Sequence, residues 1–184
     1  MKIKKLLVIV LILGGFTALN AQPVEKGNKI LNLGIGLGST LYTGSYYKST
    51  MPPVSASLEY IIKDDLFNDK GAIGLGGYAG FAGFKYDYLG WGYKYTNIII
   101  GPRGYLHYNF LDKLDTYTGL LIGYNIVKAT EFGTSTGWSY NASSSGLIWS
   151  WFAGGRYFFT DNLAGMLELG YGIAYLNIGI ALKF

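Results

Sequence analysis

The sequence predicts an all-β protein, a single closed antiparallel barrel of eight strands that crosses a membrane as an up-and-down meander. Apolar residues alternate with small or polar ones, with a period of two, through nearly all of residues 29–184. Glycine is 28 of 184 residues and charged residues are only 14%, whereas soluble domains carry about 25% charged residues. No stretch after residue 21 is apolar for the length of a spanning helix. A closed barrel is the other structure that satisfies every backbone group in lipid.

The first 21 residues have the pattern of an export signal. Residues 1–5 are basic, an apolar run covers 6–16, and the small residue Ala21 precedes the expected cleavage point. The apolar run is shorter than the roughly 20 residues of a membrane-spanning helix. We therefore expect a signal peptide over residues 1–21 and an outer-membrane β-barrel over residues 22–184.

Charge and cysteine content exclude several classes of function. Without the three lysines of the signal, the chain carries 12 basic against 11 acidic residues, so its basic character belongs largely to the removed segment. Nucleic-acid binding is therefore not expected. The chain has no cysteine, which excludes a lipoprotein anchor, a disulfide framework and a cysteine metal site. No His, Asp or Glu cluster has metal-ligand spacing, so we expect no cofactor.

The residues that alternate with the apolar ones indicate whether the apolar side chains point into a soluble core or out to lipid. A soluble exported barrel would turn their face to water and fill it with charged residues. Here it carries mainly Gly, Ala, Ser and Asn, which suit the interior of a narrow barrel. We therefore expect the apolar face to meet lipid. The expected strands cover about residues 31–37, 54–62, 72–86, 97–108, 117–126, 147–157, 163–171 and 176–184.

The connections alternate between short and long, as in outer-membrane barrels, where the long set faces outside. The short turns are expected at residues 63–70, 110–114 and 159–163, and the long loops at residues 39–53, 87–93 and 129–145.

Two local features bear on how the strands pair. The apolar phase flips between Ile173 and Leu176, which predicts a tight turn near residues 172–175 and hence eight strands. A bulge there would leave seven strands and turn Phe184 to the wrong face. Pro102 lacks an N–H for the ladder, so we expect a local bulge around it.

The last residues resemble the C-terminal assembly signal of bacterial outer-membrane proteins. Ile178, Ile180 and Leu182 alternate toward the terminal aromatic Phe184, with Gly179 upstream. With the export signal and eight strands, residues 29–184 are similar to the small OmpA/OmpX-type β-barrel family, although no motif identifies a particular member. The resemblance implies an integral outer-membrane location and contact with outer-membrane lipid and lipopolysaccharide. It also implies recognition of the last strand by the barrel-assembly machinery.

Four charged residues are expected on the inner face: Glu59, Arg103, Arg156 and Glu168. Because a charge in a narrow lumen is costly unless it is paired, we interpret them as a structural network. A turn centred on Asn162 would place Arg156 directly opposite Glu168, in contact. The alternative is that these charges line a narrow channel for ions or small solutes.

His107 is the single histidine and lies on the expected inner face. Some small outer-membrane barrels are enzymes that modify lipid A with a histidine near the outer leaflet. The expected topology places His107 toward the periplasmic end, so we interpret it as a lumen or rim residue.

The long loops carry aromatic residues among Gly, Ser and Thr, a composition that suits adaptable recognition. These residues are Tyr42, Tyr46, Tyr47, Trp91, Trp138 and Tyr140. We therefore expect a non-enzymatic outer-membrane protein that has a structural role or binds an unknown surface ligand through its outer loops.

Overall fold

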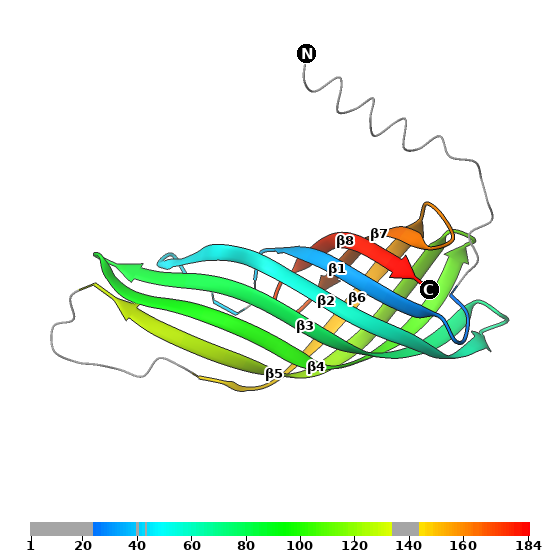
Figure 1. Ribbon diagram of the computed structural model, residues 1–184, viewed down its shortest axis with the longest axis horizontal. Helices are drawn as coiled ribbons and strands as arrows, with labels where there is room; N and C mark the ends of the chain where they lie inside the picture. The colour runs from blue at the N-terminus through cyan, green and yellow to red at the C-terminus, as the bar shows by residue number, and fades with distance from the viewer. Residues whose placement is uncertain (1–23, 40, 43, 134–143) are drawn as a thin grey trace, which may run out of the picture.

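The computed structural model describes residues 24–39, 41–42, 44–133 and 144–184. Within these residues, eight strands form one closed antiparallel barrel in which each strand pairs with the next and the last pairs with the first (Figure 1). The predicted fold class is confirmed, while the expected signal peptide lies outside the described residues. The strands are β1 (Lys29–Leu37), β2 (Tyr47–Leu66), β3 (Gly71–Tyr88), β4 (Trp91–Leu111), β5 (Leu114–Phe132), β6 (Gly146–Phe158), β7 (Leu163–Gly170) and β8 (Leu176–Lys183).

In the part of the chain that the structure describes, no helix is long and apolar enough to cross a membrane.

Side chains alternate between the lumen and the outer surface, as the sequence pattern predicts. The outward row of β5, for example, contains exposed Leu120 and Ile122, whereas its neighbours Leu121 and Asn125 are buried inside. Every strand contributes to the exposed apolar surface around the barrel, which is suited to contact with lipid. Its exposed residues include Leu33, Leu58, Leu75, Ile98, Ile100, Trp149, Leu167 and Ile180.

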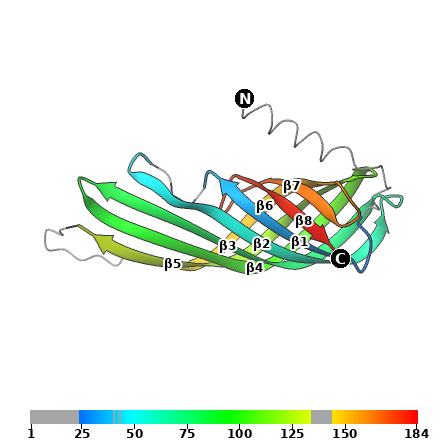
Figure 2. The ribbon, with the colours of Figure 1, turned by 45° about the horizontal axis from the view of Figure 1, so that its top comes forward.

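The strands differ greatly in length. β2 to β5 have 20, 18, 21 and 19 residues, whereas β1, β7 and β8 have 9, 8 and 8. At one end, the four long strands run past the rest of the barrel as a curved sheet (Figures 1 and 2). We call this the extended end. The opposite end, where short turns join β2 to β3, β4 to β5 and β6 to β7, is the turn end.

The extended end is more regular than the sequence pattern suggests. The loop expected over residues 87–93 is a two-residue turn, because Tyr88 pairs directly with Trp91. The turn residues Leu89 and Gly90 both have positive φ, +52° and +88°. The strand after the first expected loop also begins early, at Tyr47.

The turn between β7 and β8 lies where the apolar phase flips. Leu169 pairs with Leu176 across it, and Gly172 within it has a φ of +133°. The predicted turn and the count of eight strands are therefore confirmed. Phe184 consequently follows the outward row of β8 and is exposed.

The bulge predicted at Pro102 is wrong. Pro102 pairs with Gly77 of β3, and the register between β4 and β5 is the same before and after it. The β4–β5 ladder lapses between Ile100 and Arg103 and then resumes. The missing N–H therefore interrupts the ladder without adding a residue to the strand.

The lumen is filled in layers. Buried apolar residues close both ends, and the polar network described below lies between them. The turn-end layer comprises Val24, Ile30, Ile61, Ala72, Phe158, Ala164 and Ala181. The extended-end layer comprises Ala82, Phe84, Ile99, Leu121, Ile173 and Ala174. The expectation of a lumen wall made mainly of small residues is therefore incomplete, because large side chains also point inward.

Candidate functional site

Arg156 on β6 connects four strands from the centre of the lumen. Its side chain is fully buried. Nη2 lies 2.7 Å from Glu59 Oε2 on β2, and Nη1 lies 2.8 Å from Asp115 Oδ2 on β5. Nε donates to Asn32 Oδ1 on β1 at 2.9 Å. The bonds to Glu59 and Asn32 reach strands that are not adjacent to β6 and so fix the width of the barrel, whereas the bond to Asp115 joins neighbouring strands.

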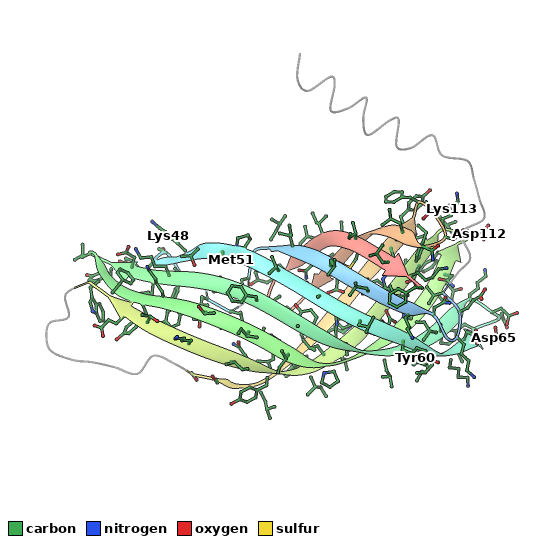
Figure 3. All side chains as sticks on the ribbon, viewed as in Figure 1. Lys48, Met51, Tyr60, Asp65, Asp112 and Lys113 are labelled. Atoms are coloured by element: carbon green, nitrogen blue, oxygen red, sulfur yellow. The ribbon has the colours of Figure 1, made fainter. Side chains whose placement is uncertain are left out.

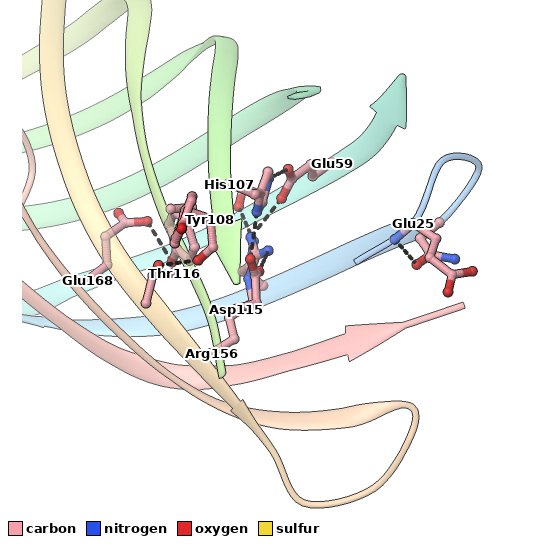
Figure 4. A network of polar contacts seen from close by, with 12 residues as sticks. Glu25, Glu59, His107, Tyr108, Asp115, Thr116, Arg156 and Glu168 are labelled. Carbon is pink, nitrogen blue, oxygen red and sulfur yellow. Dashed lines mark hydrogen bonds and ion pairs between the residues drawn. The ribbon is translucent and has the colours of Figure 1, made fainter. Parts of the chain in front are cut away.

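His107 on β4 lies between the same two carboxylates (Figure 4). Its Nε2 is 2.5 Å from Glu59 Oε1 and its Nδ1 is 2.8 Å from Asp115 Oδ1. Each carboxylate therefore contacts Arg156 through one oxygen and His107 through the other. An ionised carboxylate only accepts hydrogen bonds, so with both ionised the imidazole donates from both nitrogens. We call Glu59, His107, Asp115 and Arg156 the buried square.

A second ion pair lies next to the buried square, toward the extended end. Arg103 Nη2 on β4 is 2.9 Å from Glu168 Oε1 on β7. The Arg103 guanidinium lies 3.5 Å from the centroid of the Phe152 ring, and Tyr117 Oη donates to Glu168 Oε2 at 3.2 Å. This pair also spans the lumen, and aromatic faces cover its cation.

The direct contact predicted between Arg156 and Glu168 is wrong. Both residues point into the lumen, but Glu168 is opposite Gly154 and Arg156 is opposite Met166. The turn is therefore centred one residue earlier than Asn162, which moves the pairing by two residues. Arg156 instead pairs with Glu59 on β2, which is not adjacent to β6, and with Asp115 on the neighbouring strand β5. Arg103 on β4 pairs with Glu168 on β7.

All four charged residues expected in the lumen are buried there: Glu59, Arg103, Arg156 and Glu168. Sequence reasoning missed Asp115, which is 2% exposed and belongs to the buried square. Asp115 lies two residues before the inward Tyr117, and this spacing was the available signal. Among the described residues, no group of three His, Cys, Asp or Glu side chains is arranged to hold a metal ion.

Nine aromatic rings form one connected cluster on the inner face of the extended end. Their ring centroids lie 4.8–6.3 Å from the nearest partners. We call this the aromatic cluster: Tyr42, Tyr46, Tyr47, Phe84, Tyr86, Tyr88, Trp91, Tyr93 and Tyr95. Phe84 and Tyr93 are buried within it, whereas Tyr46 and Tyr88 are 51% and 48% exposed. The cluster thus presents aromatic surface above the closed lumen.

Four of the six aromatics predicted for the long loops belong to this cluster. Tyr42 and Tyr46 lie in the first connection, whereas Tyr47 begins β2 and Trp91 begins β4. Tyr42 stacks on Tyr95 at 4.8 Å and packs against the extended-end layer. Trp138 and Tyr140 lie outside the described residues.

The residues of the C-terminal signal form the seam that closes the barrel. Ile178, Ile180, Leu182 and Phe184 point outward. Gly179 approaches β1 so closely that a Cβ there would lie 1.9 Å from the carbonyl oxygen of Leu33. The Phe184 and Lys29 backbones exchange hydrogen bonds of 2.8 and 2.9 Å. Recognition of this strand by an assembly machinery stays a prediction.

The fold is shared with solved outer-membrane proteins. Ail, the attachment invasion locus protein of Yersinia pestis, solved with the heparin analogue sucrose octasulfate, has a TM-score of 0.53 and 14% identity over 86% of this chain and 99% of that one. OprG from Pseudomonas aeruginosa has a TM-score of 0.52 and 13% identity over 89% and 98%.

No protein-family model and no curated protein matches the sequence. The identities to the solved barrels are low, so these similarities establish the fold and leave the activity open. The closed eight-stranded meander, its apolar outer surface and its match to both barrels along nearly their whole length agree with one another. The chain therefore has the fold of the small eight-stranded outer-membrane β-barrels, of the OmpA/OmpX-like type.

Proposed function

We propose that this chain is a non-enzymatic integral outer-membrane protein that binds at the cell surface through the aromatic cluster. In this proposal the signal peptide directs export and the extended end faces outside. The turn end, which carries Phe184, faces the periplasm. The single observation that carries the proposal is the run of β2 to β5 beyond the barrel, with aromatic rings on the inner face of this extension.

The filled lumen supports a binding role over a channel. Arg156 and Arg103 are paired across it, and apolar layers lie on both sides of the polar network. An ion would have to displace these buried contacts, and breaking a buried pair is costly.

The surroundings of His107 support a non-enzymatic role. A histidine that activates a nucleophile needs a free ring nitrogen to accept a proton. Both nitrogens of His107 lie within hydrogen-bond distance of carboxylates, and its side chain is fully buried. These contacts suit a structural residue.

The composition of the extended end supports recognition. Tyrosine and tryptophan supply large, rigid contact area at low entropic cost, and exposed Tyr46 and Tyr88 offer such area at the rim. The name of Ail associates that protein, which has the same fold, with attachment. A surface ligand bound by stacking and hydrogen bonding would fit this rim.

The test compares cells that produce the wild-type protein with cells that produce a Tyr46→Ser, Tyr88→Ser variant. Adhesion is measured to an array of immobilised sugars and extracellular matrix proteins. We expect the wild-type protein to raise adhesion to at least one surface, and the variant to lose most of that increase. The control variant, Tyr60→Ser, Tyr157→Ser, alters equally exposed tyrosines of the outer barrel surface. It is expected to keep the increase in adhesion. Equal adhesion of the wild-type and the Tyr46/Tyr88 variant to every surface would contradict the proposal.

A further inference from the structure

Three lysines form a row on the outer face of the extended end. Lys85 on β3 pairs directly with Lys48 on β2 and with Lys94 on β4. Neighbouring strands lie about 4.8 Å apart, so three lysine side chains start from adjacent backbone positions on one face. Like charges directly opposite each other destabilise a sheet. The fold therefore maintains an unfavourable arrangement at this position.

The row continues the outward face of the barrel. On β4, Lys94 lies four residues beyond Ile98, on the same face, and Ile98 belongs to the exposed apolar surface. On β5, Lys128 follows exposed Ile126 by two residues. Lys48 and Met51 lie at this end in Figure 3, whereas Asp65, Asp112 and Lys113 lie at the turn end. The lysines therefore begin where the lipid-facing surface stops.

Acidic neighbours balance only a small part of this charge. On the outer face of the described extended end, Asp87 is the single carboxylate beside Lys48, Lys85, Lys94 and Lys128. The hydrogen bond from Lys85, 2.6 Å long, lowers the pKa of Asp87, which keeps the carboxylate ionised. Among the ion pairs of the described residues, this is the one that includes any of the four lysines.

The turn end shows that this excess is local. There, outside the lumen, the described chain carries five basic and six acidic residues, interspersed along the turns and strand ends. They are Lys26, Lys29, Lys63, Lys70 and Lys113 against Glu25, Asp64, Asp65, Asp69, Asp112 and Asp161.

We propose that Lys48, Lys85, Lys94 and Lys128 bind the phosphate groups of an anionic outer-leaflet lipid, a class that includes phosphorylated lipid A. Phosphates at the membrane boundary would neutralise the lysine row at the level where the apolar surface ends. Lysine suits this role as a flexible point charge that binds phosphate without a fixed angle. Anionic lipids attract basic residues placed next to a membrane-spanning segment.

This site is separate from the aromatic cluster. The lysines point outward from strands whose inward neighbours, such as Phe84 and Tyr95, belong to the cluster. Phe132 lies beneath two of them, with its ring centroid 4.2 Å from Lys85 Nζ and 6.0 Å from Lys94 Nζ. An anionic lipid could therefore occupy the outer face while a surface ligand occupies the inner one.

The test measures retained lipid by native mass spectrometry. The folded barrel is placed in phosphatidylcholine nanodiscs that contain either lipid A with both phosphates or the same lipid dephosphorylated. We expect the wild-type protein to retain the phosphorylated lipid at least tenfold more. The variant Lys48→Gln, Lys85→Gln, Lys94→Gln is expected to lose that preference at least tenfold. The control variant Lys63→Gln, Lys70→Gln, Lys113→Gln alters the turn end and is expected to retain the preference for the phosphorylated lipid.

Heat-dependent gel mobility verifies that both triple variants are folded before the comparison is made. Equal retention of the two lipids by the wild-type protein, or unchanged retention by the row variant, would overturn the proposal. Inorganic phosphate or a soluble sulfated sugar that displaces the lipid at equal phosphate or sulfate concentration would assign the row to soluble anions and also overturn it. The cell-adhesion test of the Tyr46/Tyr88 variant is independent of all these outcomes.

Discussion

At the scale of single residues, the buried square shows what an alternating sequence reveals and what it conceals. Alternation places Glu59, Arg103, Arg156 and Glu168 on the inner face, and the structure has all four in the lumen. It does not identify their partners, because contacts across a lumen depend on the stagger of all eight strands. A shift of two residues in the register of the β6–β7 hairpin was enough to remove the predicted contact between Arg156 and Glu168.

Asp115 illustrates a second limit. It follows the β4–β5 turn, where aspartate ordinarily serves the turn itself. In the structure it pairs with Arg156 across the β5–β6 ladder and also binds His107. An aspartate that serves a turn and an aspartate that binds inside the lumen therefore look the same in the sequence. Only the side of the strand to which the residue points distinguishes them.

Arg156→Met is expected to destabilise the barrel strongly. Glu59 and Asp115 would each lose a cationic partner inside the lumen, and removing one member of a buried pair costs about 3–5 kcal/mol. The measurement is the free energy of unfolding in urea, followed by gel mobility of the barrel in lipid vesicles. Combining Arg156→Met with Glu59→Gln and Asp115→Asn should recover part of the loss, because the stranded charges are removed. The control, Lys63→Met at an exposed site, should change the free energy of unfolding little. If Arg156→Met lost no more stability than this control, the stabilising role of the buried square would be contradicted.

At the scale of elements, the β3–β4 hairpin departs most from expectation. Its turn carries no Asn-Gly or Asp-Gly signal, so the sequence suggests a longer loop. In the structure both turn residues have positive φ, the geometry of a type I′ turn, whose twist matches the flanking strands. The uninterrupted pairing of β3 with β4 evidently outweighs the poor turn residue. By contrast, the β7–β8 turn was predictable, because the apolar phase flips across it.

Leu89→Asn is expected to stabilise this hairpin. Leu89 has a φ of +52° and is 91% exposed, so it contributes strain and little burial. Asparagine adopts the left-handed region more readily than other non-glycine residues, and the expected gain is about 0.5–1 kcal/mol. Urea unfolding in the same vesicles measures it.

The control for that substitution is Leu111→Asn, at an exposed position beside the β4–β5 turn that has no positive φ. This change should leave stability equal or lower. If both substitutions had the same effect, backbone strain at Leu89 would not be the cause.

At the scale of the whole molecule, the barrel is organised as a filled cylinder with a one-sided extension. Apolar layers at both ends surround the buried square and the Arg103–Glu168 pair. The extension separates aromatic residues on its inner face from lysines on its outer face. Alternation predicted the cylinder, since lipid and lumen impose opposite chemistry on successive residues. The extension arises because β2 to β5 are longer than the other strands and continue past the region where lipid enforces that pattern.

The filled lumen predicts that the folded protein does not conduct ions. In planar-bilayer recordings, the wild-type barrel is expected to give no stable channel above background, because each layer of the lumen is occupied by packed or paired side chains. Heat-dependent gel mobility of the same preparation establishes that the inserted protein is folded. A double variant that removes bulk from the narrow middle, Arg103→Ala with Phe152→Ala, deletes the stacked pair at 3.5 Å and should raise the frequency of brief openings. A stable, ion-selective conductance from the wild-type protein would instead favour the narrow channel, and the charges of the lumen would then be read as its selectivity lining.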